Sequence, residues 1–289
     1  LLWAAVLGAA LVLAEGQPTR MATGESPALW ALIGGAAALV IVYRAGLQWL
    51  RSRVQEPEAE TQGGLFSDTE LNRYARHIVL REIGGLGQKR LKDAKVLVIG
   101  AGGLGSPVLL YLAAAGVGTI GVVDDDEVDN SNLQRQVIHR DDAIGMPKVF
   151  SAEAAMKAQN PFVTVKPYQR RLDEETAAAL IGEYDLVLDG TDNFTTRYLV
   201  NRACVAAGVP LVSGALSQWE GQVTIFDPKQ GTPCYKCLFP TEPAAGIAPS
   251  CSEAGVVAPL PGIIGSMMAL EAVKLITGAG HILRGEMLI

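Results

Sequence analysis

Three glycines stand at the spacing Gly-x-Gly-x-x-Gly after a short apolar run, in the stretch Lys95-Val96-Leu97-Val98-Ile99-Gly100-Ala101-Gly102-Gly103-Leu104-Gly105-Ser106. An apolar pattern with helical spacing follows. The stretch therefore predicts a strand, a tight turn and a helix, which open many nucleotide-binding folds. Gly100 lets the chain turn, and Gly105 lets the helix pack close to the strand. Between them, Gly102 and Gly103 let backbone N–H groups approach a phosphate at the positive end of the helix. The alternative is a structural turn in a parallel sheet.

An acidic residue stands where a nucleotide site needs one. A second predicted strand, residues 119–123, is followed at once by Asp124. This position lies roughly twenty residues beyond the glycines, where a carboxylate can accept hydrogen bonds from ribose hydroxyls. The combination indicates a nucleotide site more strongly than the glycine spacing does alone.

Composition and charge narrow the class of protein. The chain has 289 residues, of which 49% are hydrophobic and 32 are glycine, and this suits one α/β domain with an extension. The net charge of −6 argues against general nucleic-acid binding through a basic surface. The four cysteines are too few and too unevenly spaced for a disulfide scaffold, so they indicate metal binding or thiol chemistry in a reducing compartment.

Two uncharged apolar runs precede this domain, at residues 1–14 and 28–43. Both are slightly shorter than the roughly 20 residues that span a bilayer. Because the first residue is Leu rather than Met, we expect that the chain has been cut at its N-terminus. A signal peptide would have one apolar run, and a complete α/β domain needs no core hairpin upstream of it. We therefore predict two transmembrane helices.

The residues that flank the second run predict its orientation. Three aromatic residues stand near its ends, as in the aromatic belt of a membrane helix: Trp30, Tyr43 and Trp49. Three arginines follow the run, against one in the loop before it: Arg44, Arg51 and Arg53, against Arg20. This asymmetry predicts a protein of the cell inner membrane whose C-terminal part lies in the cytoplasm.

The chain therefore divides into a membrane segment (residues 1–53), a linker (54–66) and a soluble α/β domain (67–289). The linker is acidic and contains glycine, with little apolar periodicity. At the start of the domain, Ser67-Asp68-Thr69-Glu70 predicts a capped amphipathic helix.

Alternating strand and helix patterns predict the architecture of this domain. Further helices are predicted from residue 147 onward and at 173–182, 195–207 and 262–277, and further strands at 163–165, 185–189, 210–213 and 222–226. The last of these strands differs in character from the others. We therefore predict a Rossmann-like, doubly wound and mainly parallel α/β sheet with an antiparallel C-terminal extension, preceded by transmembrane helices.

Six motifs occur in the order, and at close to the separations, of one family. They are GAGGLG, the run at residues 124–136 that ends in SNLQRQ, GMPK, LDGTDN, CYKC and EAGVVAPLPGIIGS. On these motifs, residues 67–289 resemble the MoeB/ThiF/HesA branch of the ubiquitin-activating-enzyme-like adenylyltransferases. The resemblance does not extend to the two apolar runs.

The resemblance implies a homodimeric enzyme that uses ATP and Mg²⁺. Its substrate would be the C-terminal glycine of a small ubiquitin-like sulfur-carrier protein, in molybdopterin or thiamin biosynthesis. The carrier carboxylate would attack the α-phosphate, and pyrophosphate would leave. A sulfur donor would then convert the acyl adenylate into a thiocarboxylate.

The resemblance also implies which residues bind the nucleotide. They are Gly100, Gly102, Gly103, Gly105, Asp124, Ser131, Asn132, Leu133, Gln134, Arg135, Lys148, Asp192 and Asn193. Arg135 and Lys148 are the cations expected along the polyphosphate, and Asp192 is the expected Mg²⁺ ligand. On geometry alone Asp189 suits the metal equally, and each of these side chains by itself could be a solvated surface residue.

The cysteines bear on zinc and on covalent chemistry. Cys234 and Cys237 have the C-x-x-C spacing of a Zn²⁺ knuckle, and the resemblance implies a second pair near the C-terminus, beyond the end of this chain. Cys251 matches the cysteine with which some relatives form a covalent link to the activated carrier, whereas other relatives do without it. Cys204 stands among apolar residues of a predicted helix, which indicates a core position.

The first helix of the domain carries Arg73 and Arg76 beside the apolar residues Leu71, Tyr74, Ile78 and Val79. The apolar face must be buried against something, and we expect that both arginines have an anionic partner. The resemblance implies that Arg76 reaches across a two-fold interface to the ATP phosphates of the partner subunit. The alternative is a surface helix with solvated arginines.

Two other classes of function compete with adenylation. An NAD-dependent oxidoreductase would account for the glycine spacing but would leave Arg135, Lys148 and the Thr191-Asp192-Asn193 loop unexplained. A catalytically idle, membrane-tethered scaffold is disfavoured by the intact set of charged residues. Within the family, relatives act on other substrates, including a modified base in transfer RNA, and the sequence does not identify the carrier.

Overall fold

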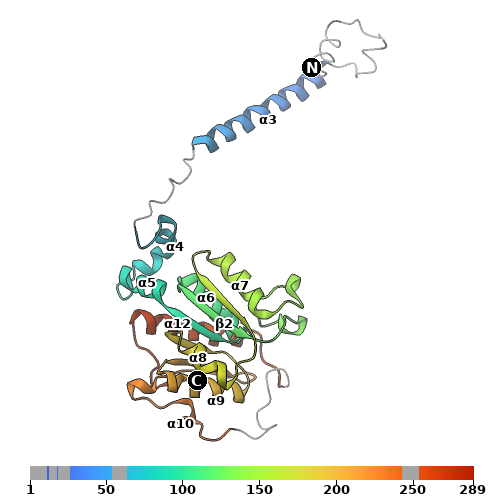
Figure 1. Ribbon diagram of the computed structural model, residues 1–289. Helices are drawn as coiled ribbons and strands as arrows, with labels where there is room; N and C mark the ends of the chain where they lie inside the picture. Colours follow the sequence, from blue (N-terminus) through green and yellow to red (C-terminus); the bar gives the residue numbers. More distant parts are fainter. Residues whose placement is uncertain (1–11, 13–17, 19–26, 54–63, 243–253) are drawn as a thin grey trace. The chain divides into compact units, whose positions relative to one another are not determined.

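The computed structural model describes residues 12, 18, 27–53, 64–242 and 254–289. The chain divides into two compact units, Leu1–Gly64 and Leu65–Ile289. Helix α3 (Pro27–Arg53) is the main described element of the first unit (Figure 1). The first predicted apolar run, residues 1–14, lies outside the described residues except for residue 12.

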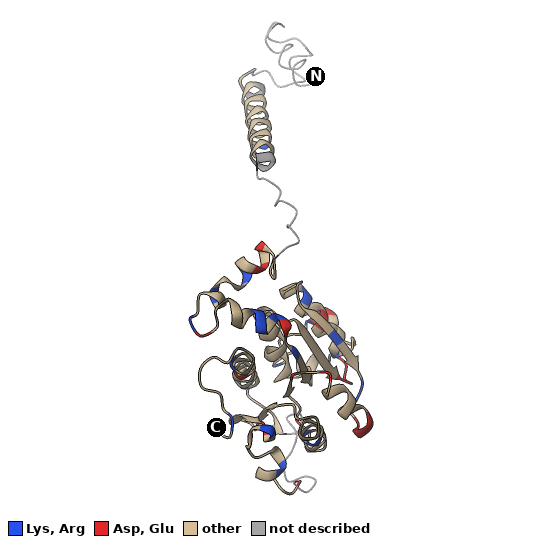
Figure 2. Ribbon diagram, turned by 60° about the vertical axis from the view of Figure 1, so that its left-hand side comes forward, with Lys and Arg blue, Asp and Glu red and all other residues tan. Residues whose placement is uncertain are grey.

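Helix α3 is apolar along most of its length, and Figure 2 shows it largely tan. Its stretch Ala31–Trp49 has 19 residues and a mean hydropathy of 1.5, and none of it is buried. This helix is long and apolar enough to cross a membrane, although a signal sequence near the N-terminus would meet the same criteria. Helix α12 (Pro259–Thr277) meets the same criteria, but 44% of it is buried inside its unit, as in a core helix.

The second unit is built on a seven-stranded sheet in the order β3-β2-β1-β4-β5-β6-β7. Its strands are β1 (Lys95–Ile99), β2 (Thr119–Asp124), β3 (Thr164–Gln169), β4 (Leu186–Asp189), β5 (Leu211–Leu216), β6 (Gly221–Phe226) and β7 (Met287–Leu288). Strands β1 to β5 pair in parallel, whereas β6 and β7 pair antiparallel. This mixed sheet confirms the predicted parallel α/β arrangement that ends in an antiparallel extension.

Helices cover both faces of the sheet (Figure 1). The helices of this unit are α4 (Asp68–Ile78), α5 (Gly84–Asp93), α6 (Gly105–Ala115), α7 (Lys148–Gln159), α8 (Glu174–Ile181), α9 (Phe194–Ala207), α10 (Tyr235–Leu238) and α12, of which α4 packs on α5 rather than on the sheet. Short 3₁₀ turns lie at Asn130–Asn132, Asp141–Ala143 and Pro228–Gln230.

Side chains that alternate in direction along the strands form two hydrophobic cores, one on each face of the sheet. Successive strand residues point to opposite faces. Val96 and Val98 of β1 therefore pack with α5, α6, α7 and α12. Leu97 and Ile99 pack with α8, α9 and α10 on the other face. A strand that is buried on both faces has a continuous apolar sequence, and this pattern predicted β1.

The structure differs from the predicted elements in a few places. Helix α5 was not predicted, because its glycine-rich sequence has no clear apolar period. Strand β3, predicted at 163–165, extends to Gln169 along its pairing with β2. Helix α12 begins at Pro259 rather than at residue 262, since proline is well tolerated in the first turn of a helix.

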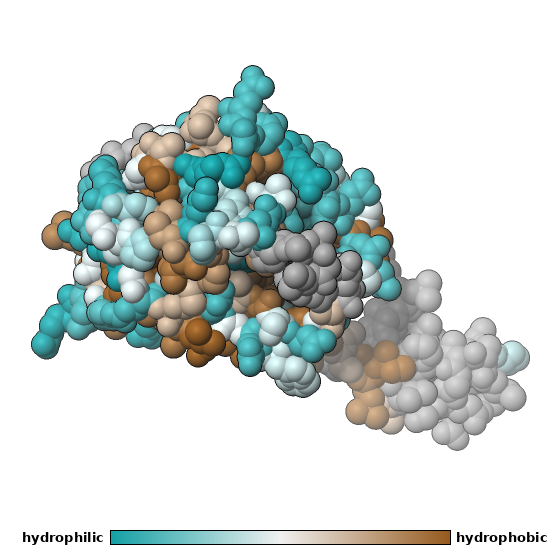
Figure 3. All heavy atoms as spheres, turned by 90° about the horizontal axis from the view of Figure 1, so that it is seen from below, coloured by the Kyte–Doolittle hydropathy of each residue, from teal (hydrophilic) through white to brown (hydrophobic). Residues whose placement is uncertain are grey.

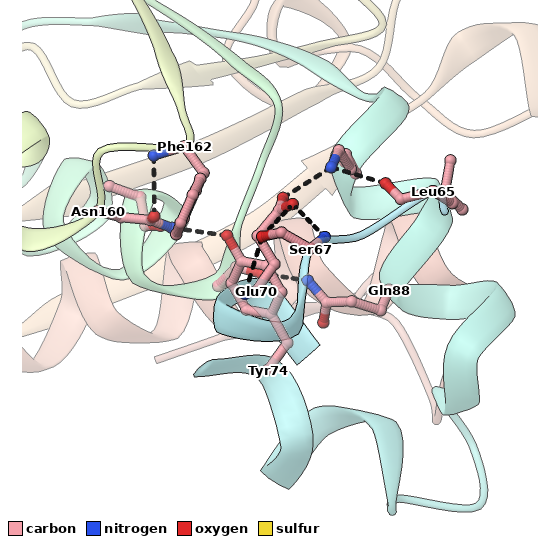
Figure 4. A network of polar contacts seen from close by, with 10 residues as sticks. Leu65, Ser67, Glu70, Tyr74, Gln88, Asn160 and Phe162 are labelled. Carbon is pink, nitrogen blue, oxygen red and sulfur yellow. Dashed lines mark hydrogen bonds and ion pairs between the residues drawn. The ribbon is translucent and has the colours of Figure 1, made fainter. Parts of the chain in front are cut away.

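Helix α4 is anchored by the polar network of Figure 4. The predicted cap is confirmed: Ser67 Oγ accepts a hydrogen bond from the Glu70 N–H at 3.3 Å, and Glu70 Oε2 accepts one from the Ser67 N–H at 3.0 Å. Tyr74 is buried, and its hydroxyl accepts a hydrogen bond from Asn160 Nδ2 at 2.8 Å. The helix that carries the two arginines is therefore fixed to the sheet unit.

Candidate active site

A cavity of about 510 Å³ opens at the carboxyl ends of β1, β2 and β4. Nine predicted nucleotide-binding residues line it: Gly100, Gly102, Gly103, Asp124, Asn132, Arg135, Lys148, Asp192 and Asn193. Four others do not line it: Gly105, Ser131, Leu133 and Gln134. Ligands of open α/β sheets bind at this edge, so the cavity has the position expected of a nucleotide site.

The glycine loop has the conformation that a phosphate-binding turn needs. Gly100 has a φ of 94°, which side-chain-bearing residues rarely adopt. A Cβ at Gly105 would lie 1.9 Å from the Gly100 carbonyl oxygen, so only glycine allows helix α6 to start this close to the strand. Gly105 therefore shapes the loop without lining the cavity.

Asp124 supports the loop in addition to facing the cavity. Its Oδ2 accepts a hydrogen bond from the Ala101 N–H at 2.7 Å, and its Oδ1 accepts one from the Asp126 N–H at 2.9 Å. Burial raises the pKa of this carboxyl, while Lys148 and the two hydrogen bonds oppose the shift. Each oxygen keeps a second lone pair with which to accept from a ribose hydroxyl.

Two cations reach the cavity from different segments. Lys148 is buried at the start of α7, and its Nζ donates to Asp126 Oδ2 at 2.7 Å. Arg135 is half-buried, and its Nη1 donates to the Ser131 carbonyl at 3.2 Å. Both groups can neutralise phosphate charge where water is partly excluded.

The carboxylates divide between structure and ligand binding. Asp189 is buried, and its Oδ1 accepts hydrogen bonds from the N–H and hydroxyl of Thr191 at 2.9 and 2.6 Å. Asp192 is exposed in the cavity wall and has no hydrogen-bond partner among the described residues. Asp192 is therefore the better placed of the two to hold Mg²⁺.

A second acidic group lines the same cavity, and no motif of the sequence identified it as a metal site. The carboxylate oxygens of Asp124, Asp125 and Asp126 lie within 4.8 Å of one another. Hard cations such as Mg²⁺ bind such oxygens. The cavity wall also includes Arg170, Arg171 and Leu172, from the loop after β3, which carry no motif that could have identified them.

The arginines of α4 behave differently from each other. Arg73 Nη1 donates to the Gln159 carbonyl at 2.7 Å, and its guanidinium lies 5.8 Å from the centre of the Phe162 ring. Within its own chain, the described partners of Arg73 are thus a carbonyl oxygen and an aromatic ring rather than an anion. Arg76 is exposed and is absent from the described lining of the cavity. The predicted apolar face is only partly covered, because Tyr74 is buried whereas Leu71 and Val79 are exposed.

The Sγ atoms of Cys234 and Cys237 lie 3.5 Å apart at the start of α10. Burial opposes ionisation of Cys234, but hydrogen bonds from Cys237, Asn201 and the Lys236 backbone lower the pKa of its thiol overall. Cys204 is buried, and burial raises the pKa of its thiol, which confirms a core position. Cys251 lies outside the described residues.

A buried histidine also contacts the glycine loop, although the histidines show no sequence pattern. His139 Nε2 lies 2.9 Å from the Ala101 carbonyl oxygen, and Nδ1 lies 2.9 Å from Ser151 Oγ. Burial lowers the pKa of His139; the hydrogen bond to Ala101 opposes this shift, and the charge of Lys148 adds to it.

This shift predicts a loss of stability in acid. The unfolded chain takes up a proton near the ordinary histidine pKa of 6.5, before the folded chain does, so stability that is present above this pH is lost as the pH falls below it. The free energy of unfolding, measured by denaturant titration between about pH 8 and about pH 5, should fall more steeply for the wild type than for His139→Gln. Parallel pH profiles of the two proteins would contradict the assignment.

A second cavity, of about 720 Å³, adjoins the first. The two share Leu104, Thr191, Asp192 and Leu216. Aromatic residues of α9, α10 and the segment after it also line the second cavity: Phe194, Tyr235 and Phe239. A second substrate could therefore reach the atoms bound beside Asp192.

Comparison with known proteins places the sheet unit in one group. The sequence model of the ThiF family matches residues 74–289. A sulfur carrier protein adenylyltransferase of Thermus thermophilus is 50% identical over 224 residues, which are 76% of this chain and 83% of the relative. The SAMP-activating enzyme E1 of Haloferax volcanii is 49% identical over 220 residues, which are 76% of this chain and 81% of the relative. The crystal structure of E. coli MccB with ATP is similar at a TM-score of 0.64 and 27% identity, over 73% of this chain and 65% of that chain.

Proposed function

The chain belongs to the ThiF family, and we propose that it adenylates the C-terminal glycine of a small ubiquitin-like sulfur-carrier protein with ATP. The observation that carries this proposal is the meeting of the glycine loop, Lys148, Arg135 and Asp192 in one cavity. The substrate class follows from the similarity to a sulfur carrier protein adenylyltransferase, at 50% identity. The pathway is molybdopterin or thiamin biosynthesis.

The geometry suits attack of a carboxylate on the α-phosphate of ATP. The glycine loop and Lys148 hold the phosphates, and Arg135 opposes the charge that passes to the leaving pyrophosphate. The second cavity, which shares Asp192 with the first, admits the carrier's C-terminal tail. Mg²⁺, when bound by Asp192, would neutralise phosphate charge.

The test is the exchange of labelled pyrophosphate into ATP by the full chain. Exchange requires a reversible adenylation step, so it should occur only when a carrier is added. A carrier that lacks its C-terminal glycine is the control and should not support exchange. Exchange without any carrier, or no exchange with any ubiquitin-like carrier, would refute the proposal.

We also propose that the enzyme acts as a homodimer. Arg76 is exposed outside its own cavity, as a residue that serves a second subunit would be. Hydrophobic patches lie among hydrophilic residues on the face shown in Figure 3. Helices α6 and α12 also form an apolar groove of about 670 Å³ with exposed Tyr111, Ile263 and Leu270, which a second copy would cover.

For the cysteine pair, we propose half of a Zn²⁺ site. The two sulfur atoms of Cys234 and Cys237 lie close together, and the lowered pKa of Cys234 favours the thiolate that binds zinc. A structural zinc takes four ligands, so these two would need a further pair. Elemental analysis of the protein purified together with the further ligand pair, compared with Cys234→Ser, tests the site: equal zinc in both would refute it.

The N-terminal unit supports a further proposal, a tether to the cytoplasmic face of the inner membrane. The stretch Ala31–Trp49 of α3 is apolar and unburied; Arg44 lies in its C-terminal part, and Arg51 and Arg53 follow it in the sequence. Arginines on one side of a span favour the cytoplasmic side.

Fractionation of cells tests the tether. The full chain should sediment with membranes and be released only by detergent, because burying an apolar helix in lipid is strongly favourable. A chain that begins at Ser67 should stay in the supernatant and retain exchange activity. Full chain in the high-speed supernatant without detergent would exclude the tether.

A further inference from the structure

The Ala101 residue of the glycine loop is held from both sides. Its N–H donates to Asp124 Oδ2 at 2.7 Å, and its carbonyl oxygen lies 2.9 Å from His139 Nε2. Ala101 stands between Gly100 and Gly102, so these two contacts fix the peptide planes from which the loop N–H groups project. Glycine-rich backbone is otherwise the most flexible kind.

The second ring nitrogen of His139 reaches another element. A carbonyl oxygen can only accept, so Nε2 must carry the proton; Nδ1 then accepts a hydrogen bond from Ser151 Oγ at 2.9 Å. Ser151 lies in the first turns of α7, three residues after Lys148. Both His139 and Ser151 are only 6% exposed. One side chain thus connects the glycine loop to the helix that begins with Lys148.

We propose that His139 is a positioning residue for adenylation, which sets the separation between the glycine loop and Lys148. The loop N–H groups and Lys148 Nζ come from segments far apart in sequence, yet both must meet one polyphosphate. Reactant groups that are misplaced by about 1 Å can cost about 10²-fold in rate. This role rests on the proposed ATP site: His139 holds the glycine loop and Lys148, which both contact the phosphates there, at a fixed separation.

The expected result is a selective loss of nucleotide affinity in His139→Leu. Leucine leaves the Ala101 carbonyl and the Ser151 hydroxyl without their partner, so the loop can shift relative to α7. The dissociation constant for ATP, measured by calorimetry on the full chain without carrier, should rise about tenfold, as for one unmade buried hydrogen bond. His139→Gln can place an amide N–H where Nε2–H was, and it should stay within about threefold of the wild type.

Met156→Ala is the matched control. Met156 is fully buried in α7, on the side of the hydrophobic core, so truncating it lowers the melting temperature without touching the loop. Weak binding by His139→Leu, with normal binding by Met156→Ala and His139→Gln, supports the positioning role. Wild-type affinity in His139→Leu overturns it, as does an equal loss of affinity in Met156→Ala.

Two further arms complete the experiment. If His139→Leu does not fold, Ser151→Ala removes only the hydroxyl partner: weaker ATP binding then supports the proposal, and unchanged binding overturns it. A wild-type chain that binds no ATP would instead refute the proposed function, so the two failures are distinguishable.

Discussion

Lys148→Ala is expected to lower carrier-dependent pyrophosphate exchange by roughly 10²–10³-fold, the effect of losing one preorganised group that stabilises transition-state charge. Lys148 Nζ is buried beside the glycine loop, where a positive charge acts more strongly on phosphate than it would in water. The variant should fold. Its ion-pair partner, Asp126, has 67% of its side chain exposed and stays solvated without the lysine, and Asp124 keeps its hydrogen bonds from the N–H groups of Ala101 and Asp126.

A second lysine of α7 provides the control. Lys157 is exposed and pairs with Glu153 at 2.6 Å, away from the cavity. Exposed pairs of this kind contribute little, so Lys157→Ala should exchange at the wild-type rate. Circular dichroism and melting curves establish that both variants are folded. Near-normal exchange by folded Lys148→Ala would exclude a role of Lys148 at the phosphates.

Mixing two inactive variants is expected to restore about a quarter of wild-type activity, if Arg76 serves the site of its partner in an isologous dimer. Arg76→Ala and Asp192→Ala should each be nearly inactive alone. In a mixed dimer, one site carries both lesions and the other carries neither. About half of all dimers are mixed, and one of two sites in each is intact.

The control pair is Arg135→Ala with Asp192→Ala. Both residues line the cavity of their own chain, so every site in a mixed dimer keeps one lesion and no activity should return. Subunit exchange is verified by differential tagging. If tagged subunits exchange and the Arg76 mixture stays inactive, Arg76 acts within its own chain or has no part in the reaction.

Local signals account for the parts of this molecule that the sequence predicts well. The positive φ of Gly100 and the contact of Gly105 with the strand depend on residues within one short turn, so glycine spacing reports them directly. The cap of α4 also forms among neighbours, Ser67 and Glu70. Buried parallel strands such as β4 are visible as apolar runs.

Long-range polar contacts leave no such signal. His139 and Ala101 are 38 positions apart, and Arg73 and Gln159 are 86 apart, so no period or motif links either pair. The folded structure also decides between Asp189 and Asp192, because Asp189 is buried at the end of β4 whereas Asp192 is exposed in the cavity wall. The chain thus encodes its glycine turn, caps and strands locally, because short-range sterics and burial fix them. Which side chains support the loop, and which remain available to a ligand, is set only when the folded sheet brings distant segments together and each buried polar group must find a partner.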